Sequence, residues 1–132
     1  MDVTVEEIKS LRERTGAGIM DCKRALEESK GNIAKAEEIL KEIGLAAAAK
    51  KSDRTTSEGL IQSYIHSGNR IGALVELACE TDFVARTTEM KELAHNLAMQ
   101  VAAMSPVYIT SDEREPQEER PPEEVCLLQQ TF

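Results

Sequence analysis

The stretch from Glu80 to Arg86 places an acidic and an aromatic side chain next to each other. An apolar run, 71–78, precedes it and a helical pattern, 90–104, follows it, so the stretch is predicted to join a strand to a helix. Asp82 can accept hydrogen bonds or disturb the ligands of a metal ion, and Phe83 can enter an apolar slot in a partner. Rigid elements on both sides fix the direction of such a junction. The same pair also suits a structural role, in which Asp82 caps a turn and Phe83 packs into the core.

Other residues with reactive side chains do not form a catalytic or metal-binding pattern. The sequence has neither a GxxxxGK[S/T] phosphate loop nor a GxGxxG motif. His66 and His95 are the only histidines, and neither has a second ligand at a spacing typical of metal sites. Cys79 and His66 fall on adjacent predicted strands, but no third group would orient the histidine. We therefore predict no catalytic residue, no metal and no cofactor, in a protein that is not an enzyme.

Composition limits both the core and the partners. The 132 residues are 41% hydrophobic but only 3% aromatic, so Ala, Leu, Ile and Val must fill the interior, which favours closely packed helices. The net charge is −8, and residues 111–132, with seven acidic and two basic residues, contribute −5 of it. The nearly neutral remainder has no cluster of Lys and Arg, which argues against direct nucleic-acid binding.

The cysteines and the absence of long apolar runs indicate the compartment. Three cysteines lie far apart in the sequence, an odd number that favours reduced thiols over a disulfide framework. No run of about 18 apolar residues and no signal-peptide pattern occurs, so we expect no membrane segment. These features suit the cytoplasm or an organellar stroma or matrix.

Residues 1–51 are predicted to form a bundle of three short helices. A T-x-x-E capping box begins at Thr4, and the third helix is expected to end at Gly44. Ile19 and Met20 are adjacent, and two neighbouring residues of a helix cannot both face one core. One of them should therefore be exposed as a candidate contact. The alternative is that Met20 only covers the edge of the bundle.

Residues 58–109 are predicted to form a β-hairpin packed on a long helix, after a linker at 52–57. Two strands, 59–66 and 70–78, flank a Ser-Gly-Asn turn, and the helix at 90–104 has apolar residues at helical spacing. Such a unit is thin, so we expect a further strand, a partner chain or a dimer to complete it. The predicted fold class is α+β.

Residues 110–132 are acidic and contain three prolines, at positions 116, 121 and 122. This composition predicts a poorly ordered tail. Its last part includes an apolar patch, 125–128, that would dock on the folded chain.

Two stretches resemble the signatures of a known family. The run LRERTGAGIMDCKRAL, Leu11 to Leu26, is similar to the first signature of bacterial and organellar elongation factor Ts, and ETDFVAR, Glu80 to Arg86, is similar to the second. The resemblance extends from about Val5 to Ile109. It implies a ubiquitin-associated-like three-helix domain followed by an antiparallel sheet with helices.

The resemblance also implies a function. Family members bind elongation factor Tu with GDP, disturb its Mg²⁺ site and promote GDP release, which is guanine-nucleotide exchange and not catalysis in the bond-making sense. The implied contacts form an exchange loop, an N-terminal surface and a hairpin tip. They are Thr81, Asp82, Phe83 and Val84 in the loop, Leu11, Ile19 and Met20 in the N-terminal domain, and His66 and Gly68 at the tip.

The chain departs from the family pattern near its end. Residues 112–124 are fewer and richer in proline than the corresponding family segment, and residues 126–132 resemble a late apolar motif after which the family continues with a helix and a sheet-completing strand. We therefore expect a short form with a truncated C-terminus. Short members of the family dimerise through this sheet, and because the completing strand is missing here, a homodimer and completion by another chain are both left open. Two other functions stay open. One is a passive binding module with weak or no exchange activity, and the other is an acidic adaptor whose binding is sensitive to salt.

Overall fold

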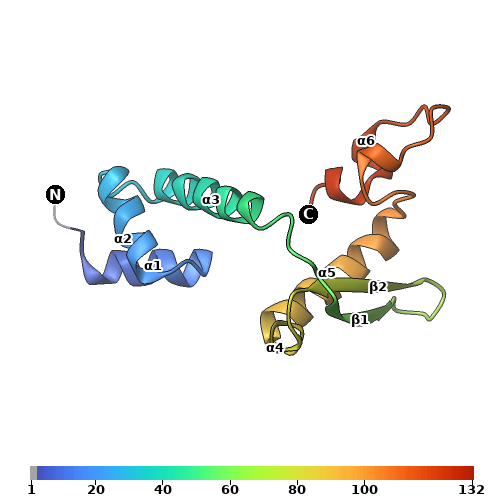
Figure 1. Ribbon diagram of the computed structural model, residues 1–132, viewed down its shortest axis with the longest axis horizontal. Coiled ribbons are helices and arrows are strands. Elements are labelled where there is room, and N and C mark those ends of the chain that lie inside the picture. Colours follow the sequence, from blue (N-terminus) through green and yellow to red (C-terminus); the bar gives the residue numbers. More distant parts are fainter. Residues whose placement is uncertain (1–2) are drawn as a thin grey trace. The chain divides into compact units, whose positions relative to one another are not determined.

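The computed structural model describes residues 3–132, which form two compact units, one ending at Arg54 and the other spanning Thr55–Phe132. The first unit contains three helices, and the second contains a two-stranded antiparallel sheet with a long helix beside it (Figure 1). The predicted α+β class is thereby confirmed. The division between the units falls within the predicted linker, 52–57. Among the described residues, no helix is both long and apolar enough to cross a lipid bilayer.

The first unit consists of α1 (Val5–Thr15), α2 (Ile19–Glu28) and α3 (Ile33–Lys50). The predicted capping box begins α1, because the backbone N–H of Glu7 donates to the Thr4 hydroxyl at 3.2 Å while the Thr4 N–H donates to the Glu7 carboxylate at 2.8 Å. These two bonds satisfy donors that a helix N-terminus otherwise leaves unpaired.

Helix α3 is longer than the sequence indicated. It passes through Gly44, the expected end, and continues to Lys50. Glycine ends a helix when its backbone turns left-handed, as Gly16 does after α1 with φ 69°. Gly44 has no positive φ, and the alanine-rich residues after it favour the helix enough to offset the roughly 1 kcal/mol that a helical glycine costs.

The core of the first unit is small and mostly aliphatic. Its buried members come from all three helices. They are Leu11, Cys22, Ala25, Leu26, Ala36 and Leu40. A core of this size leaves a three-helix unit only marginally stable by itself.

The second unit is built on the hairpin of β1 (Glu58–Ile65) and β2 (Gly72–Cys79), which pair antiparallel from Glu58↔Cys79 to Ile65↔Gly72. The turn closes with the His66 N–H donating to the Ile71 carbonyl at 2.8 Å. At its tip, positive φ angles of 92° at Gly68 and 59° at Asn69 confirm the turn that the sequence predicted.

Helix α5 (Thr88–Met104) packs against one face of the hairpin. Its buried side chains are Met90, Ala94 and Ala98, four residues apart, whereas Leu93 and Met104, which belong to the same helical apolar pattern, are 41% and 52% exposed. The stripe is therefore narrower than the sequence suggested, since two thin strands cover only part of the helix. The other face of the hairpin exposes three large apolar side chains, those of Ile61, Ile65 and Leu74.

The segment 110–132, for which the composition suggested poor order, has local structure. It contains the 3₁₀ turns η1 (Ser111–Glu113) and η2 (Leu127–Gln129) and the short helix α6 (Pro122–Val125). Tyr108 and Cys126 form a parallel bridge that closes the intervening residues into a loop. Val125 and Cys126, from the predicted docking patch, are almost fully buried.

Candidate partner-binding site

The acidic–aromatic stretch forms a single helical turn, α4 (Asp82–Ala85), between β2 and α5. Thr81 caps this turn, because its hydroxyl accepts a hydrogen bond from the Val84 N–H at 3.3 Å. Thr87 ends it by donating its hydroxyl to the Val84 carbonyl at 2.7 Å, and also caps α5. The Cys79 thiol, at the end of β2, donates to the Thr81 carbonyl at 3.1 Å. Side-chain bonds at both ends therefore hold the turn.

The two side chains of interest point to solvent. Phe83 is 79% exposed, so the alternative in which its ring fills the core is excluded. Asp82 is not the cap of the turn, a role taken by Thr81; its carboxylate instead forms an ion pair with Arg86 four residues later. Val84 is also partly exposed. The turn thus presents an aromatic ring beside a carboxylate on a fixed backbone.

The N-terminal candidates separate into two groups. Met20 is exposed, as expected for one of the adjacent pair, but Ile19 is 54% exposed as well. Ile19 is the first residue of α2, and both members of the adjacent pair are therefore available at the start of this helix. Leu11 is fully buried in the core and presents no surface to a partner.

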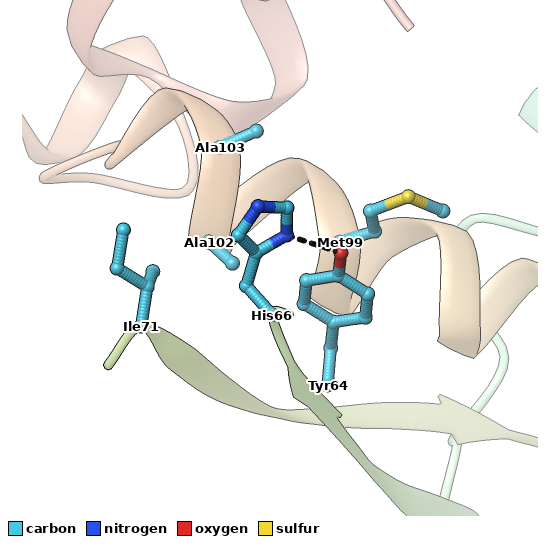
Figure 2. A pocket seen from close by; sticks show the side chains of 6 residues that line it. All are labelled: Tyr64, His66, Ile71, Met99, Ala102 and Ala103. Atoms are coloured by element: carbon cyan, nitrogen blue, oxygen red, sulfur yellow. Dashed lines mark hydrogen bonds between the residues drawn. The ribbon is translucent and has the colours of Figure 1, made fainter. Parts of the chain in front are cut away.

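The hairpin tip contains the remaining candidates. The Tyr64 hydroxyl and His66 Nδ1 lie 2.8 Å apart, and the Tyr64 ring meets the His95 ring edge-on with centroids 5.9 Å apart. Figure 2 shows the His66 and Tyr64 side chains converging above α5. They line a pocket of about 310 Å³. Its other lining residues are Ile71, Met99, Ala102 and Ala103. Gly68, at the turn itself, has open space around it.

The structure does not bring all the candidates together. Within the second unit, Asp82 and Phe83 follow the Cys79 end of β2, whereas His66 and Gly68 lie beyond its Gly72 end. Eight strand residues separate these ends, a span of about 26 Å. A partner that contacts both must therefore cover the length of the hairpin.

Sequence reasoning missed Arg86. The guanidinium pairs with Asp82, and its Cζ atom lies 5.9 Å from the centroid of the Phe83 ring. The signal was present, because an acidic and a basic residue at i and i+4 lie on one face of a helical turn. It was overlooked because a four-residue helix is too short to be recognised from periodicity.

Shifts in pKa occur away from the candidate contacts. Hydrogen bonds from the backbone N–H and then the hydroxyl of Thr4 lower the pKa of Glu7. The Arg120 side chain and then its backbone N–H lower the pKa of Glu118 to about 2. Across residues 3–132, no group of three His, Cys, Asp or Glu side chains is arranged to hold a metal ion. The titratable groups thus stabilise local structure.

The fold and the site define an α+β protein that joins a small helical bundle to a hairpin–helix unit presenting an acidic–aromatic turn. A family profile described as Elongation factor TS matches residues 4–132, nearly all of the chain. The chain therefore belongs to the elongation factor Ts family.

Curated relatives agree with this assignment. Elongation factor Ts of Thermotoga maritima is 58% identical over 113 residues, which cover 86% of this chain and 57% of the relative. The proteins of the same name from Carboxydothermus hydrogenoformans and Syntrophomonas wolfei are 58% and 59% identical, each over 111 residues. Both matches cover 84% of this chain, and they cover 51% and 52% of the two relatives, respectively. The chain thus spans a little over half the length of the relatives that it matches.

Proposed function

We propose that this chain acts in translation elongation as a guanine-nucleotide exchange factor that binds elongation factor Tu with GDP. The observation that carries the proposal is the exposure of Phe83, 79%, on a turn held at both ends by side-chain hydrogen bonds. Membership of the elongation factor Ts family and the similarity to proteins of that name support it. We place this activity in the cytoplasm or an organellar matrix.

The mechanism follows from how a GTPase retains its nucleotide. Such a protein holds GDP through Mg²⁺ and through groups around the phosphates. In the proposed complex, the Phe83 ring enters an apolar slot near the metal, and the Asp82 carboxylate competes for groups that order the metal site. Loss of the ion then weakens GDP binding. Because the exchange factor binds the nucleotide-free state best, linkage requires that it weaken nucleotide binding by the same factor.

Two further surfaces would anchor the partner. Ile19 and Met20, both exposed at the start of α2, supply an apolar contact from the first unit. His66 and Gly68 supply a contact at the hairpin tip. Leu11 contributes indirectly, because its burial in the core supports the helices that carry the exposed pair. We propose no direct contact with nucleic acid or membrane.

The exchange function is tested by the release of labelled GDP from purified elongation factor Tu. The intact chain should accelerate release, and Phe83→Ala should reduce the acceleration at saturating concentrations. Phe132→Ala is a matched control, because it truncates the only other phenylalanine, which is 69% exposed. No acceleration by the intact chain, or equal activity of the two variants, would refute the proposal.

A passive binding module is the second candidate. It is favoured by the separate hydrophobic core of the first unit, which supports the exposed Ile19 and Met20 without help from the Phe83 turn. In that case the chain would bind elongation factor Tu without releasing GDP, and Phe83→Ala would leave the affinity unchanged. Calorimetric titration beside the release assay separates the two functions.

We also propose that a second copy or another chain completes the sheet. The hairpin exposes Ile61, Ile65 and Leu74 on the face opposite α5, and each is more than half exposed. Apolar area of this kind on a two-stranded sheet is typical of an interaction surface. A molar-mass measurement in solution would give a dimer if the chain completes itself. A monomer would show that the chain does not complete its own sheet.

A further inference from the structure

We propose that Arg86 is a positioning residue that holds Asp82 and Phe83 in one arrangement before a partner binds, an inference that rests on the exchange function proposed above. Arg86 follows α4 directly and reaches back over it. One guanidinium therefore contacts both side chains of the turn, the carboxylate through an ion pair and the ring through its face.

The arrangement follows from spacing on one helical turn. Residues 82, 83 and 86 are separated by three and four positions, so their side chains lie on the same side of the turn. Backbone hydrogen bonds also hold Arg86 in this position. Its N–H donates to the Asp82 carbonyl at 3.2 Å and to the Phe83 carbonyl at 3.3 Å. The backbone of Arg86 is thus fixed to the two residues that its side chain contacts.

The ion pair is too exposed to be important for stability. The side chains of Arg86 and Asp82 are 70% and 54% exposed, and pairs of this kind contribute little to folding. A cation near an exposed ring likewise adds little. The consequence is conformational, because a largely exposed Phe83 would otherwise sample several rotamers. Restricting those rotamers in the free protein lowers the entropy lost on binding.

The charge of Arg86 has a second consequence at the proposed target. The GDP bound to a GTPase carries negatively charged phosphate groups, so an unpaired carboxylate would be repelled as it approached. With Arg86 beside it, Asp82 arrives as part of a pair that is close to neutral. Removing the guanidinium should therefore weaken binding more at low ionic strength than at high, because screening shortens the repulsion.

The first test uses the free chain. Three-bond couplings at Phe83 should show one dominant χ1 rotamer in the wild type, averaged rotamers in Arg86→Met, and partial recovery in Arg86→Lys. Lys91→Met, which removes a positive charge from exposed α5 surface, should leave the couplings unchanged. Identical couplings in Arg86→Met and the wild type would overturn the inference whatever the chain binds.

The second test uses GDP release from elongation factor Tu. Arg86→Met should raise the concentration of half-maximal effect by about two- to fivefold, the factor expected from ordering one side chain, with little change in the maximal rate. Phe83→Ala should lower the maximal rate instead. In the Phe83→Ala background the effect of Arg86→Met should shrink, because the two residues act as one unit.

The outcomes separate the two proposals. Unchanged GDP release in Phe83→Ala refutes the exchange mechanism, and the couplings of the free chain still decide the role of Arg86. A second outcome is that Phe83→Ala slows GDP release but Arg86→Met has no effect, or has the same effect in the wild-type and Phe83→Ala backgrounds. This outcome overturns only the positioning role of Arg86. Thermal unfolding of each variant should stay within a few degrees of the wild type, since all the substituted side chains are exposed.

Discussion

The side-chain amide of Gln100 donates to Oε1 of Gln130 at 3.1 Å and so joins the middle of α5 to the C-terminal segment. Gln130 is 7% exposed and in turn donates to the Glu124 carbonyl at 2.8 Å. A single amide therefore links a helix, the end of α6 and the residues after η2. Buried polar groups of this kind are costly to leave unpaired.

We predict that Gln130→Ala loosens the C-terminal segment. The substitution leaves the Gln100 amide without its acceptor, and a lost buried hydrogen bond costs about 1–3 kcal/mol. Hydrogen exchange should then accelerate at the amides of Leu127 and Leu128, which bond to the 108–109 backbone. Gln130→Glu is the control, because it keeps the acceptor for Gln100 but not the donor to Glu124. Unchanged exchange in Gln130→Ala would show that the bridge at Tyr108 alone holds the segment.

We predict a large loss of stability for one candidate contact residue of the first unit and almost none for another. Leu11→Ala should lower the free energy of unfolding by about 2–5 kcal/mol, because it opens a cavity in a core that is already small. Met20→Ala should change it by less than about 0.5 kcal/mol, since Met20 is 66% exposed. Denaturant titrations measure both. If Met20→Ala leaves stability unchanged but weakens binding to elongation factor Tu, this result supports the apolar contact of α2 independently of folding.

The local turn at residues 118–120, inside the loop between Tyr108 and Cys126, should loosen in acid. Glu118 receives hydrogen bonds from the Arg120 side chain, which lower its pKa to about 2, and Arg114 donates to the Glu118 and Arg120 carbonyls. A carboxyl whose pKa is lower in the folded state stabilises that state at pH values above its unfolded pKa, and the contribution is lost as the pH falls towards 2. Carboxyl chemical shifts at Glu118 should follow this titration. In Glu118→Gln the turn at residues 118–120 should lose its pH dependence over this range.

Local signals in the sequence predicted the elements better than their ends and contacts. The capping box at Thr4, the turn at Gly68 and the long helix α5 depend on residues within a few positions, and all three occur in the structure. The bridge between Tyr108 and Cys126 instead depends on residues eighteen positions apart. The acidic, proline-rich composition between them does not indicate that it forms.

The site was predicted in part for the same reason. Phe83 and Asp82 stood out by type, since the chain has only four Phe and Tyr residues in total and no Trp. Their exposure, however, depends on how β2 and α5 meet, and the contact with Arg86 depends on a turn of four residues. Residue types and spacing therefore identified the site, and tertiary packing determined its geometry.

Two glycines should respond to alanine in opposite directions. Gly44 lies within α3 with no atom within 4 Å of an added Cβ, so Gly44→Ala should raise the stability of the first unit by up to about 1 kcal/mol. Gly59 lies in β1, where an added Cβ would collide with the Leu77 carbonyl oxygen and approach the Ala78 Cα at 3.0 Å. Both obstacles are backbone atoms, which cannot move aside as a flexible side chain can.

Gly59→Ala should therefore distort the pairing of β1 with β2 and destabilise the second unit by about 1–3 kcal/mol, the usual cost of overpacking. Amide exchange in the hairpin measures the effect, and the first unit provides an internal reference within the same molecule. Because β2 leads into Thr81 and the exchange loop, the variant should also slow GDP release more than its stability loss alone predicts. If Gly59→Ala left amide protection in both strands at the wild-type level, the hairpin would have accommodated the added methyl group. The turn that carries Phe83 would then be less rigid than we propose.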